Sequence, residues 1–140
     1  MRVLFMCTAN SCRSQMAETW ARRLFPANWE VRSAGLLTYP IVDKTRYTMR
    51  EVGLEMTGQT SKTLDTFDLD SFDLIVTLSK EAGNFLPTLA DPHRHVKRPI
   101  DDPMSCSGNG EAQREAFRRG REEVRAIVLA VAEGRLKPGD

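Results

Sequence analysis

The sequence predicts a three-layer α/β fold, in which a four-stranded parallel sheet lies between helices on both faces. Short apolar runs alternate along the chain with stretches in which apolar residues recur at helical spacing, a pattern typical of β-α-β units. A length of 140 residues fits one domain, and a hydrophobic content of 41% is enough for a buried core. We therefore expect a single domain over residues 1–140, with any ligand bound beyond the carboxyl ends of the strands.

The first predicted unit is a strand, a loop and a helix. Residues 3–6 are a continuous apolar run, as in a strand that is buried on both faces. Apolar residues then recur at helical spacing from Met16 to Leu24, before Pro26. Apolar and charged residues alternate from Trp29 onward, which predicts a second, half-buried strand that ends at Gly35.

The middle of the chain is predicted to hold a helix, a long loop and a central strand. Asp43 is expected to cap a helix that reaches about Val52, with Gly53 as its stop. Residues 55–72 mix polar residues with isolated apolar ones, which favours a loop with at most one short helical turn. Residues 74–78 are apolar and partly β-branched, so they are expected to form a central strand.

The last part of the chain is predicted to contain a short helix, an edge strand and a long helix. The short helix runs to Phe85 and is stopped by Pro87, and a weak edge strand covers residues 95–98. From Glu111 onward the apolar residues fall on one face of a long closing helix. These residues are Phe117, Val124, Ile127, Val128 and Val131.

The charge balance and the cysteine count exclude several classes of protein. The formal net charge is +1, so the composition indicates neither a nucleic-acid surface nor a membrane-binding patch. The apolar run at the amino terminus is too short for a signal peptide or a membrane span, and a cytoplasmic protein is expected. Three cysteines favour free thiols in a reducing compartment. His93 and His95 lie far from them, so we expect no metal site.

The loop after the first strand, Cys7 to Ser14, carries the predicted chemistry. If its backbone curls so that the N–H groups point inward, it forms a nest for a dianion at the start of a helix. Arg13 can then bind two oxygens of the anion, and the positive surroundings favour the thiolate form of Cys7. The alternative without a function is that Cys7 is an inert buried thiol and Arg13 is a solvated helix residue. The predicted oxyanion-binding residues are Thr8, Ala9, Asn10, Ser11, Cys12 and Arg13.

Two side chains of this loop are predicted to support the nucleophile. Asn10 tolerates a left-handed backbone and can brace the curl with its amide. Ser14 can donate a hydrogen bond to the Cys7 sulfur. Ala9 is compatible with the curl only if its φ is negative.

A general acid is expected near the end of the fourth strand. Asp102 directly precedes Pro103, which restricts it to an extended conformation beyond the same edge of the sheet. Asp101 is the reserve candidate. The alternative is that this Asp-Pro pair is an ordinary turn.

With these two motifs together, the chain resembles the low-molecular-weight protein tyrosine phosphatase fold and, more closely, the thiol-coupled arsenate reductases built on it. Phosphatases of this fold usually have proline where Gln15 stands, which favours the reductase branch. The resemblance implies a strand order of 2-1-3-4 with a phosphate-binding loop after strand 1. The matching segments are residues 10–18, 33–35, 51–53, 73–78, 101–103 and 113–119.

The resemblance implies that Cys7 attacks arsenate, that Asp102 protonates the departing oxygen, and that a second thiol then releases arsenite. It implies no tightly bound cofactor, a small oxyanion in the loop (arsenate, phosphate or sulfate) and an external thiol reductant, either glutathione with glutaredoxin or thioredoxin. A phosphatase would instead hydrolyse the cysteinyl intermediate with water. A non-catalytic thiol redox sensor is the alternative of another class. A monomer is expected.

The second thiol is where the chain departs from the pattern. Thioredoxin-coupled relatives carry cysteines at the positions of Ser79 and about Leu86, so the relay cannot run through that segment. Cys12 and Cys106 remain as candidate resolving thiols, and an external thiol is an equal alternative.

Two further comparisons come from the resemblance. Some reductases bind potassium through residues that match Asn10, Glu18 and Ser33, together with an acid whose position is occupied here by Lys62. The Lys62 ammonium could replace the cation, or Lys62 could be an ordinary solvated lysine.

The phosphatases commonly have tyrosines after the Asp-Pro pair, where this chain has Met104 and Ser105. Only Tyr39 offers an obvious aromatic wall, which favours a small inorganic oxyanion.

Overall fold

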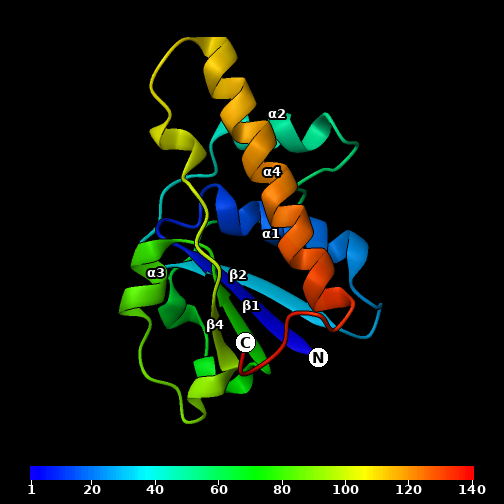
Figure 1. The fold of residues 1–140 in the computed structure, drawn as a ribbon, viewed down its shortest axis with the longest axis vertical. Coiled ribbons are helices and arrows are strands. Elements are labelled where there is room, and N and C mark those ends of the chain that lie inside the picture. The colour runs from blue at the N-terminus through cyan, green and yellow to red at the C-terminus, as the bar shows by residue number, and fades with distance from the viewer.

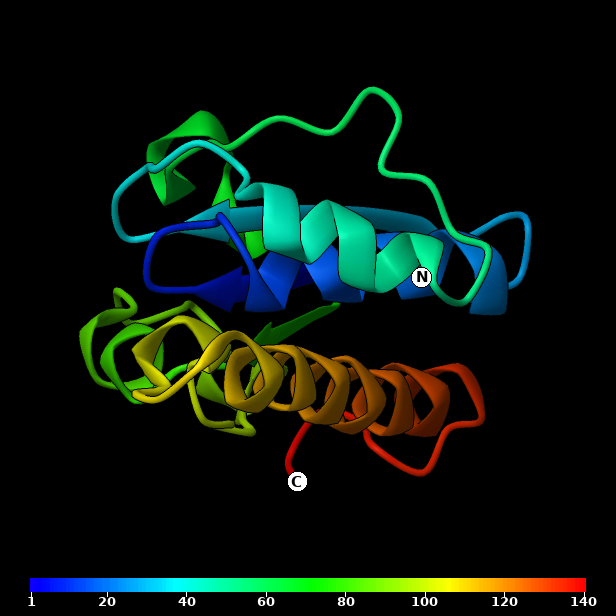
Figure 2. The same cartoon turned by 90° about the horizontal axis from the view of Figure 1, so that it is seen from above.

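The computed structural model describes residues 1–140 and has three layers (Figures 1 and 2). Four strands form one sheet in the order β2-β1-β3-β4, and every neighbouring pair is parallel. The strands are β1 (Arg2–Cys7), β2 (Glu30–Gly35), β3 (Leu74–Thr77) and β4 (His95–Lys97). The predicted strand order is confirmed.

Four α-helices and four short 3-10 turns connect and cover the strands. The helices are α1 (Arg13–Leu24), α2 (Asp43–Arg50), α3 (Lys80–Phe85) and α4 (Gly110–Ala132). The turns are η1 (Leu64–Thr66), η2 (Leu69–Ser71), η3 (Pro92–Arg94) and η4 (Pro103–Ser105). None of the helices combines the length and apolar character that crossing a membrane requires.

The two faces of the sheet bury different cores because side chains alternate along β1. Val3 and Phe5 belong to the larger apolar cluster, to which α1, α2 and α4 contribute. Leu4 and Met6 face the smaller cluster, which includes Ala82 of α3. Figure 2 shows α4 running beside α1 and α2. Helices therefore cover both faces, as predicted.

The predicted start of α2 is wrong by one residue. Val42 is the extended residue before the helix, and Asp43 is already inside its first turn with no capping side-chain hydrogen bond. A carboxylate there still interacts favourably with the helix dipole. Gly53 does end the segment, because its φ of 77° lies in the left-handed region. Between α2 and β3, η1 and η2 form two short turns where the sequence suggested at most one.

Candidate active site

The loop from Thr8 to Cys12 is curled with its carbonyl groups facing outward. Each of the five carbonyl oxygens accepts a hydrogen bond from the surrounding protein. Leu37 N donates to the Thr8 oxygen, and Tyr39 N and Ser61 Oγ both donate to that of Ala9. The oxygens of Asn10, Ser11 and Cys12 accept from Gln15 Nε2, Thr45 Oγ1 and Met16 N, in that order. The N–H groups of Ala9 to Cys12 donate no hydrogen bond within the protein. Since N–H and C=O point opposite ways in a trans peptide, the loop can present these donors to an anion.

The curl depends on one left-handed residue and one glycine behind it. Asn10 has a φ of 49° and is the one non-glycine residue with a positive φ, so Ala9 is not strained. A Cβ on Gly35 would lie 2.5 Å from the Leu37 oxygen and 2.7 Å from the Asn10 nitrogen. The end of β2 can therefore support the loop only if this residue has no side chain.

The Cys7 sulfur lies at the end of a directed hydrogen-bond chain. Asn10 Oδ1 accepts from the Lys62 N–H at 2.9 Å, and Asn10 Nδ2 donates to Ser14 Oγ at 2.8 Å. Because Ser14 accepts there, its own hydrogen is free for Cys7 Sγ, 2.8 Å away. The Ser14 N–H adds a longer contact of 3.5 Å to the same sulfur. A hydroxyl donor at this distance can stabilise negative charge on the sulfur when Cys7 acts as an attacking or leaving group.

Arg13 and Asp102 lie together beside the loop. Arg13 Nη1 donates to the Ile100 carbonyl at 3.1 Å, and Nη2 is 3.8 Å from Asp102 Oδ2. Asp102 Oδ1 caps η4 by accepting from the Met104 N–H at 2.9 Å. The structure thus places a carboxylate and a guanidinium at the mouth of the site.

A cavity of about 200 Å³ lies directly over Cys7. Asp102 lines it, whereas Asp101 lines only two neighbouring cavities. Three apolar side chains at its rim, Leu37, Tyr39 and Met104, are exposed. The sequence pointed only to Tyr39, because Leu37 and Met104 reach the rim through the fold and not through a local pattern.

Glu81 is also absent from the predicted site. It lines an adjoining cavity of about 560 Å³ together with Thr8, Arg13 and Asp102. Thr8 Oγ1 is within hydrogen-bond distance of Glu81 Oε2 (3.2 Å) and of Ser79 Oγ (3.0 Å). The Ser79 hydroxyl also caps α3, so this segment is joined to the loop through Thr8.

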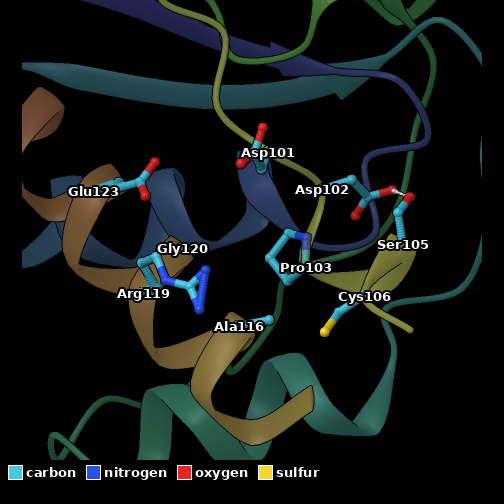
Figure 3. Close-up of a pocket in the computed structure, with 9 residues that line it drawn as sticks. All are labelled: Asp101, Asp102, Pro103, Ser105, Cys106, Ala116, Arg119, Gly120 and Glu123. Carbon is cyan, nitrogen blue, oxygen red and sulfur yellow. Dashed lines mark hydrogen bonds between the residues drawn. The ribbon is translucent and has the colours of Figure 1, made fainter. Parts of the chain in front are cut away.

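The three cysteines are free but have different surroundings. Cys12 is buried beneath the loop, and this burial raises its pKa to about 12. Cys106 is half-buried and lines a cavity of about 350 Å³ that it shares with Asp102 and Ser105 (Figure 3). Its sulfur donates to the Ala112 carbonyl at 3.6 Å.

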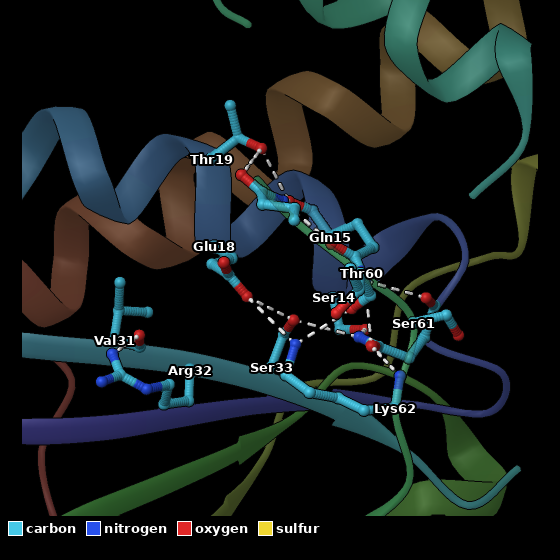
Figure 4. A network of polar contacts seen from close by, with 12 residues as sticks. Ser14, Gln15, Glu18, Thr19, Val31, Arg32, Ser33, Thr60, Ser61 and Lys62 are labelled. Carbon is cyan, nitrogen blue, oxygen red and sulfur yellow. Dashed lines mark hydrogen bonds and ion pairs between the residues drawn. The ribbon is translucent and has the colours of Figure 1, made fainter. Parts of the chain in front are cut away.

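Glu18, Ser33 and Lys62 come together behind the loop (Figure 4), and Asn10 joins them through Ser33. Ser33 Oγ accepts from Asn10 Nδ2 and donates to Glu18 Oε1 at 2.6 Å. Lys62 Nζ is 3.9 Å from the same carboxylate oxygen. Burial lowers the pKa of Lys62, and the nearby Glu18 opposes that shift. No group of three or more histidine, cysteine, aspartate or glutamate side chains is arranged to hold a metal ion.

Residues 2–133 match the sequence pattern of low molecular weight phosphotyrosine protein phosphatases. The chain belongs to this family. Within the low molecular weight phosphatase family, its relatives include arsenate reductases. The arsenate reductase of Halalkalibacterium halodurans is 36% identical over 131 residues, which cover 94% of each chain. That of Bacillus subtilis is 39% identical over 125 residues, 87% of this chain and 88% of the relative.

Solved structures of the phosphatase family also match this chain. An arsenate reductase in the phosphate binding state superposes with a TM-score of 0.82 at 31% identity, covering 95% of this chain and 97% of that one. The low molecular weight protein tyrosine phosphatase of T. tengcongensis has a TM-score of 0.79 at 24% identity, covering 96% and 99%. The second match shows the shared fold.

Proposed function

We propose that this protein is an arsenate reductase that works through a thiolate–arsenate intermediate on Cys7. The observation that supports it best is the small cavity over Cys7 in a chain that resembles arsenate reductases over nearly its whole length. A cavity of about 200 Å³ is below the usual size of pockets for larger organic ligands.

In the proposed first step, the Cys7 thiolate attacks the arsenic atom of arsenate. A sulfur–arsenic bond forms and an arsenic–oxygen bond breaks, while Asp102 protonates the oxygen, which leaves as water. Arg13 and the inward N–H groups of the loop stabilise the negative charge on the remaining oxygens. Asp102 is preferred to Asp101 because it alone of the two lines the cavity over Cys7.

In the proposed second step, another thiolate attacks the Cys7 sulfur. A disulfide forms, the sulfur–arsenic bond breaks, and its electron pair stays on arsenic, which leaves as arsenite. An external thiol reductant, glutathione with glutaredoxin or thioredoxin, then reduces the disulfide. Cys12 is poorly suited as the attacking thiol, because a pKa of about 12 keeps it protonated at neutral pH. We propose Cys106 as the internal candidate and an external thiol as its rival.

We further propose that Lys62 supplies positive charge beside the loop. Its ammonium lies 3.9 Å from the buried Glu18 carboxylate, which in turn accepts from Ser33. Substitution of Lys62 by Met would leave that carboxylate with Arg22 as its remaining cationic partner. The protein is proposed to act as a cytoplasmic monomer with one domain.

Phosphatase activity is the second candidate function, and the apolar rim of the cavity favours it. Leu37, Tyr39 and Met104 are exposed and could contact an aromatic ring above the anion site. The first step would be the same, but water would hydrolyse a cysteinyl phosphate.

One assay with two substrates separates these functions. Arsenate is supplied with glutathione and glutaredoxin, or with thioredoxin, and arsenite is measured; p-nitrophenyl phosphate is tested in parallel. Arsenite formation supports the proposal, and its absence under every reductant, with brisk phosphate release, contradicts it.

The Asp102→Asn variant separates either enzyme from a redox sensor. Loss of a general acid should slow turnover by about 10²- to 10⁴-fold. Asp101→Asn is the matched control, because Asp101 does not line the Cys7 cavity. A sensor that uses Cys7 and Cys12 would keep its oxidation response in both variants.

A further inference from the structure

Two buried glutamine side chains lie behind the loop, and neither has a part in the proposed reaction. Gln15 of α1 is fully buried, and Gln59, from the segment between α2 and η1, is 5% exposed. Gln59 Nε2 donates to Gln15 Oε1 at 2.9 Å. Gln15 Nε2 in turn lies 2.9 Å from Asn10 Oδ1 and 3.0 Å from the Asn10 carbonyl oxygen. These contacts continue the hydrogen-bond chain that ends at Cys7.

The orientation of both amides is fixed by partners that have only one hydrogen-bonding role. Gln15 Nε2 faces two backbone carbonyls, those of Asn10 and Thr60, which can only accept. Gln59 Nε2 likewise faces the backbone carbonyl of Gln15 at 3.2 Å, and the Thr19 hydroxyl, which can adapt to either role, is 3.0 Å from Gln59 Oε1. The direction of donation therefore runs from Gln59 to Gln15 and from Gln15 to Asn10 (Figure 4 shows Gln15, Thr19 and Thr60).

We infer that Gln59 and Gln15 are positioning residues for Cys7: they hold the Asn10 amide in the orientation that makes Ser14 donate to the sulfur. A flipped Asn10 amide would place an oxygen against Ser14 Oγ. Ser14 would then give its hydrogen to Asn10, and Cys7 would lose that donor. The inference rests on the proposed function in one respect, the role of Cys7 as nucleophile.

The same contacts have a simpler explanation, in which the two glutamines only satisfy one another inside the core. That explanation and the inference differ in what a substitution changes. A purely structural pair would affect the free energy of unfolding and leave the reactivity of Cys7 unaltered. A positioning pair would also change the pH at which Cys7 becomes reactive.

The test is the pH dependence of Cys7 alkylation by iodoacetamide, followed by mass spectrometry in Gln59→Met and Gln15→Met. Methionine has a similar length and no hydrogen-bonding amide. We expect the midpoint of the alkylation curve to rise by about 0.5 to 1 pH unit, the size expected when one hydrogen bond to the sulfur weakens. At a pH below the wild-type midpoint, the alkylation rate should fall about threefold to tenfold. An unchanged midpoint in folded variants would overturn the inference.

A milder variant covers the case in which these substitutions prevent folding. Thr19→Val removes only the hydroxyl next to Gln59 Oε1, and a smaller shift of the same sign is expected. Gln113→Leu is the matched control, because Gln113 lies on α4 and contacts Lys44. The titratable and charged side chains that line the cavity with Cys7 are Cys12, Arg13, Tyr39 and Asp102, and all four stay unchanged.

The assay needs no arsenate, so its outcome is independent of the proposed activity. A wild-type Cys7 that reacts no faster at neutral pH than a free cysteine would contradict its role as a nucleophile. A reactive wild-type Cys7 with unaffected Gln59 and Gln15 variants would contradict the positioning role alone.

Discussion

Single residues of the loop have opposite electrostatic surroundings although they are close in sequence. Cys7 faces a hydroxyl donor from Ser14, whereas Cys12 is buried, and its pKa is raised to about 12 mainly by loss of solvent. Nearby Cys7 and Asp102 raise that pKa further, and a hydrogen bond from Thr45 opposes the shift. The Cys12 thiol is thus kept neutral, while the Cys7 sulfur has a hydroxyl donor beside it.

The raised pKa of Cys12 predicts a loss of stability at alkaline pH. Between its ordinary value of 9.0 and about 12, Cys12 ionises in the unfolded chain but stays protonated in the folded one. Its contribution to stability is therefore complete below pH 9 and declines as the pH rises, at up to about 1.4 kcal/mol per pH unit. Urea unfolding under reducing conditions at several pH values measures this slope.

The control for this prediction is Cys12→Ala, which has no titrating group at the position. The difference in unfolding free energy between wild type and variant should shrink as the pH rises above 9. A difference that stays constant up to pH 11 would show that burial does not suppress ionisation of this thiol.

The sequence predicted the residues whose roles follow from local spacing. Cys7, Arg13 and Ser14 follow a strand and open a helix, and their proximity needs only that local fold. Glu81 and Gln59 have no such spacing signal, because long-range packing brings them to the loop.

At the scale of elements, the position of Asp102 depends on how η4 packs on α4. A Cβ on Gly120 of α4 would lie 2.8 Å from Pro103 Cγ, closer than side chains normally approach. Because Pro103 directly follows Asp102, the contact between Pro103 and α4 helps to set the distance of the Asp102 carboxylate from the loop. A glycine inside a long helix is otherwise unfavourable by about 0.5 to 1 kcal/mol relative to alanine.

We predict that Gly120→Ala lowers turnover although alanine is the better helix former. The new methyl group must displace Pro103, and a shift of Asp102 by a fraction of an ångström should reduce kcat severalfold. Steady-state arsenate reduction and circular dichroism measure activity and helix content. Gly110→Ala is the control, since its Cβ would meet nothing closer than 3.8 Å. Equal kcat values in both variants would contradict this role of Gly120.

The elements themselves were predictable to different degrees. β1 and β3 were evident from continuous apolar runs, which reflect burial on both faces. The start of α2 was predicted one residue late, because Asp43 is a residue type that favours the cap position, whereas Val42 occupies that position in the structure. η1 and η2 lie in a polar segment and pack through isolated apolar residues, a signal too weak to assign from sequence.

At the scale of the whole molecule, the site is a point where distant segments meet. The loop after β1 is hydrogen-bonded to the residues that follow β2 and β3 and to the segment that carries Lys62. Arg13 also donates to the carbonyl of Ile100, which lies in the segment between β4 and η4. An anion in the loop therefore binds to an arrangement that exists only in the folded chain.

Oxyanions should consequently stabilise the whole fold. A ligand that binds only the native state at 100 times its Kd adds about 2.7 kcal/mol to the free energy of unfolding. Arsenate, phosphate or sulfate should each raise the thermal midpoint, compared with chloride at equal ionic strength. Arg13→Lys should reduce the rise, because an ammonium cannot bind two oxygens as a planar guanidinium does. Arg135→Lys, at an exposed arginine paired with Glu133, should retain it. An equal rise with chloride, or an undiminished rise in Arg13→Lys, would contradict specific binding of the anion in the loop, since only the native arrangement brings Arg13 beside those inward N–H groups.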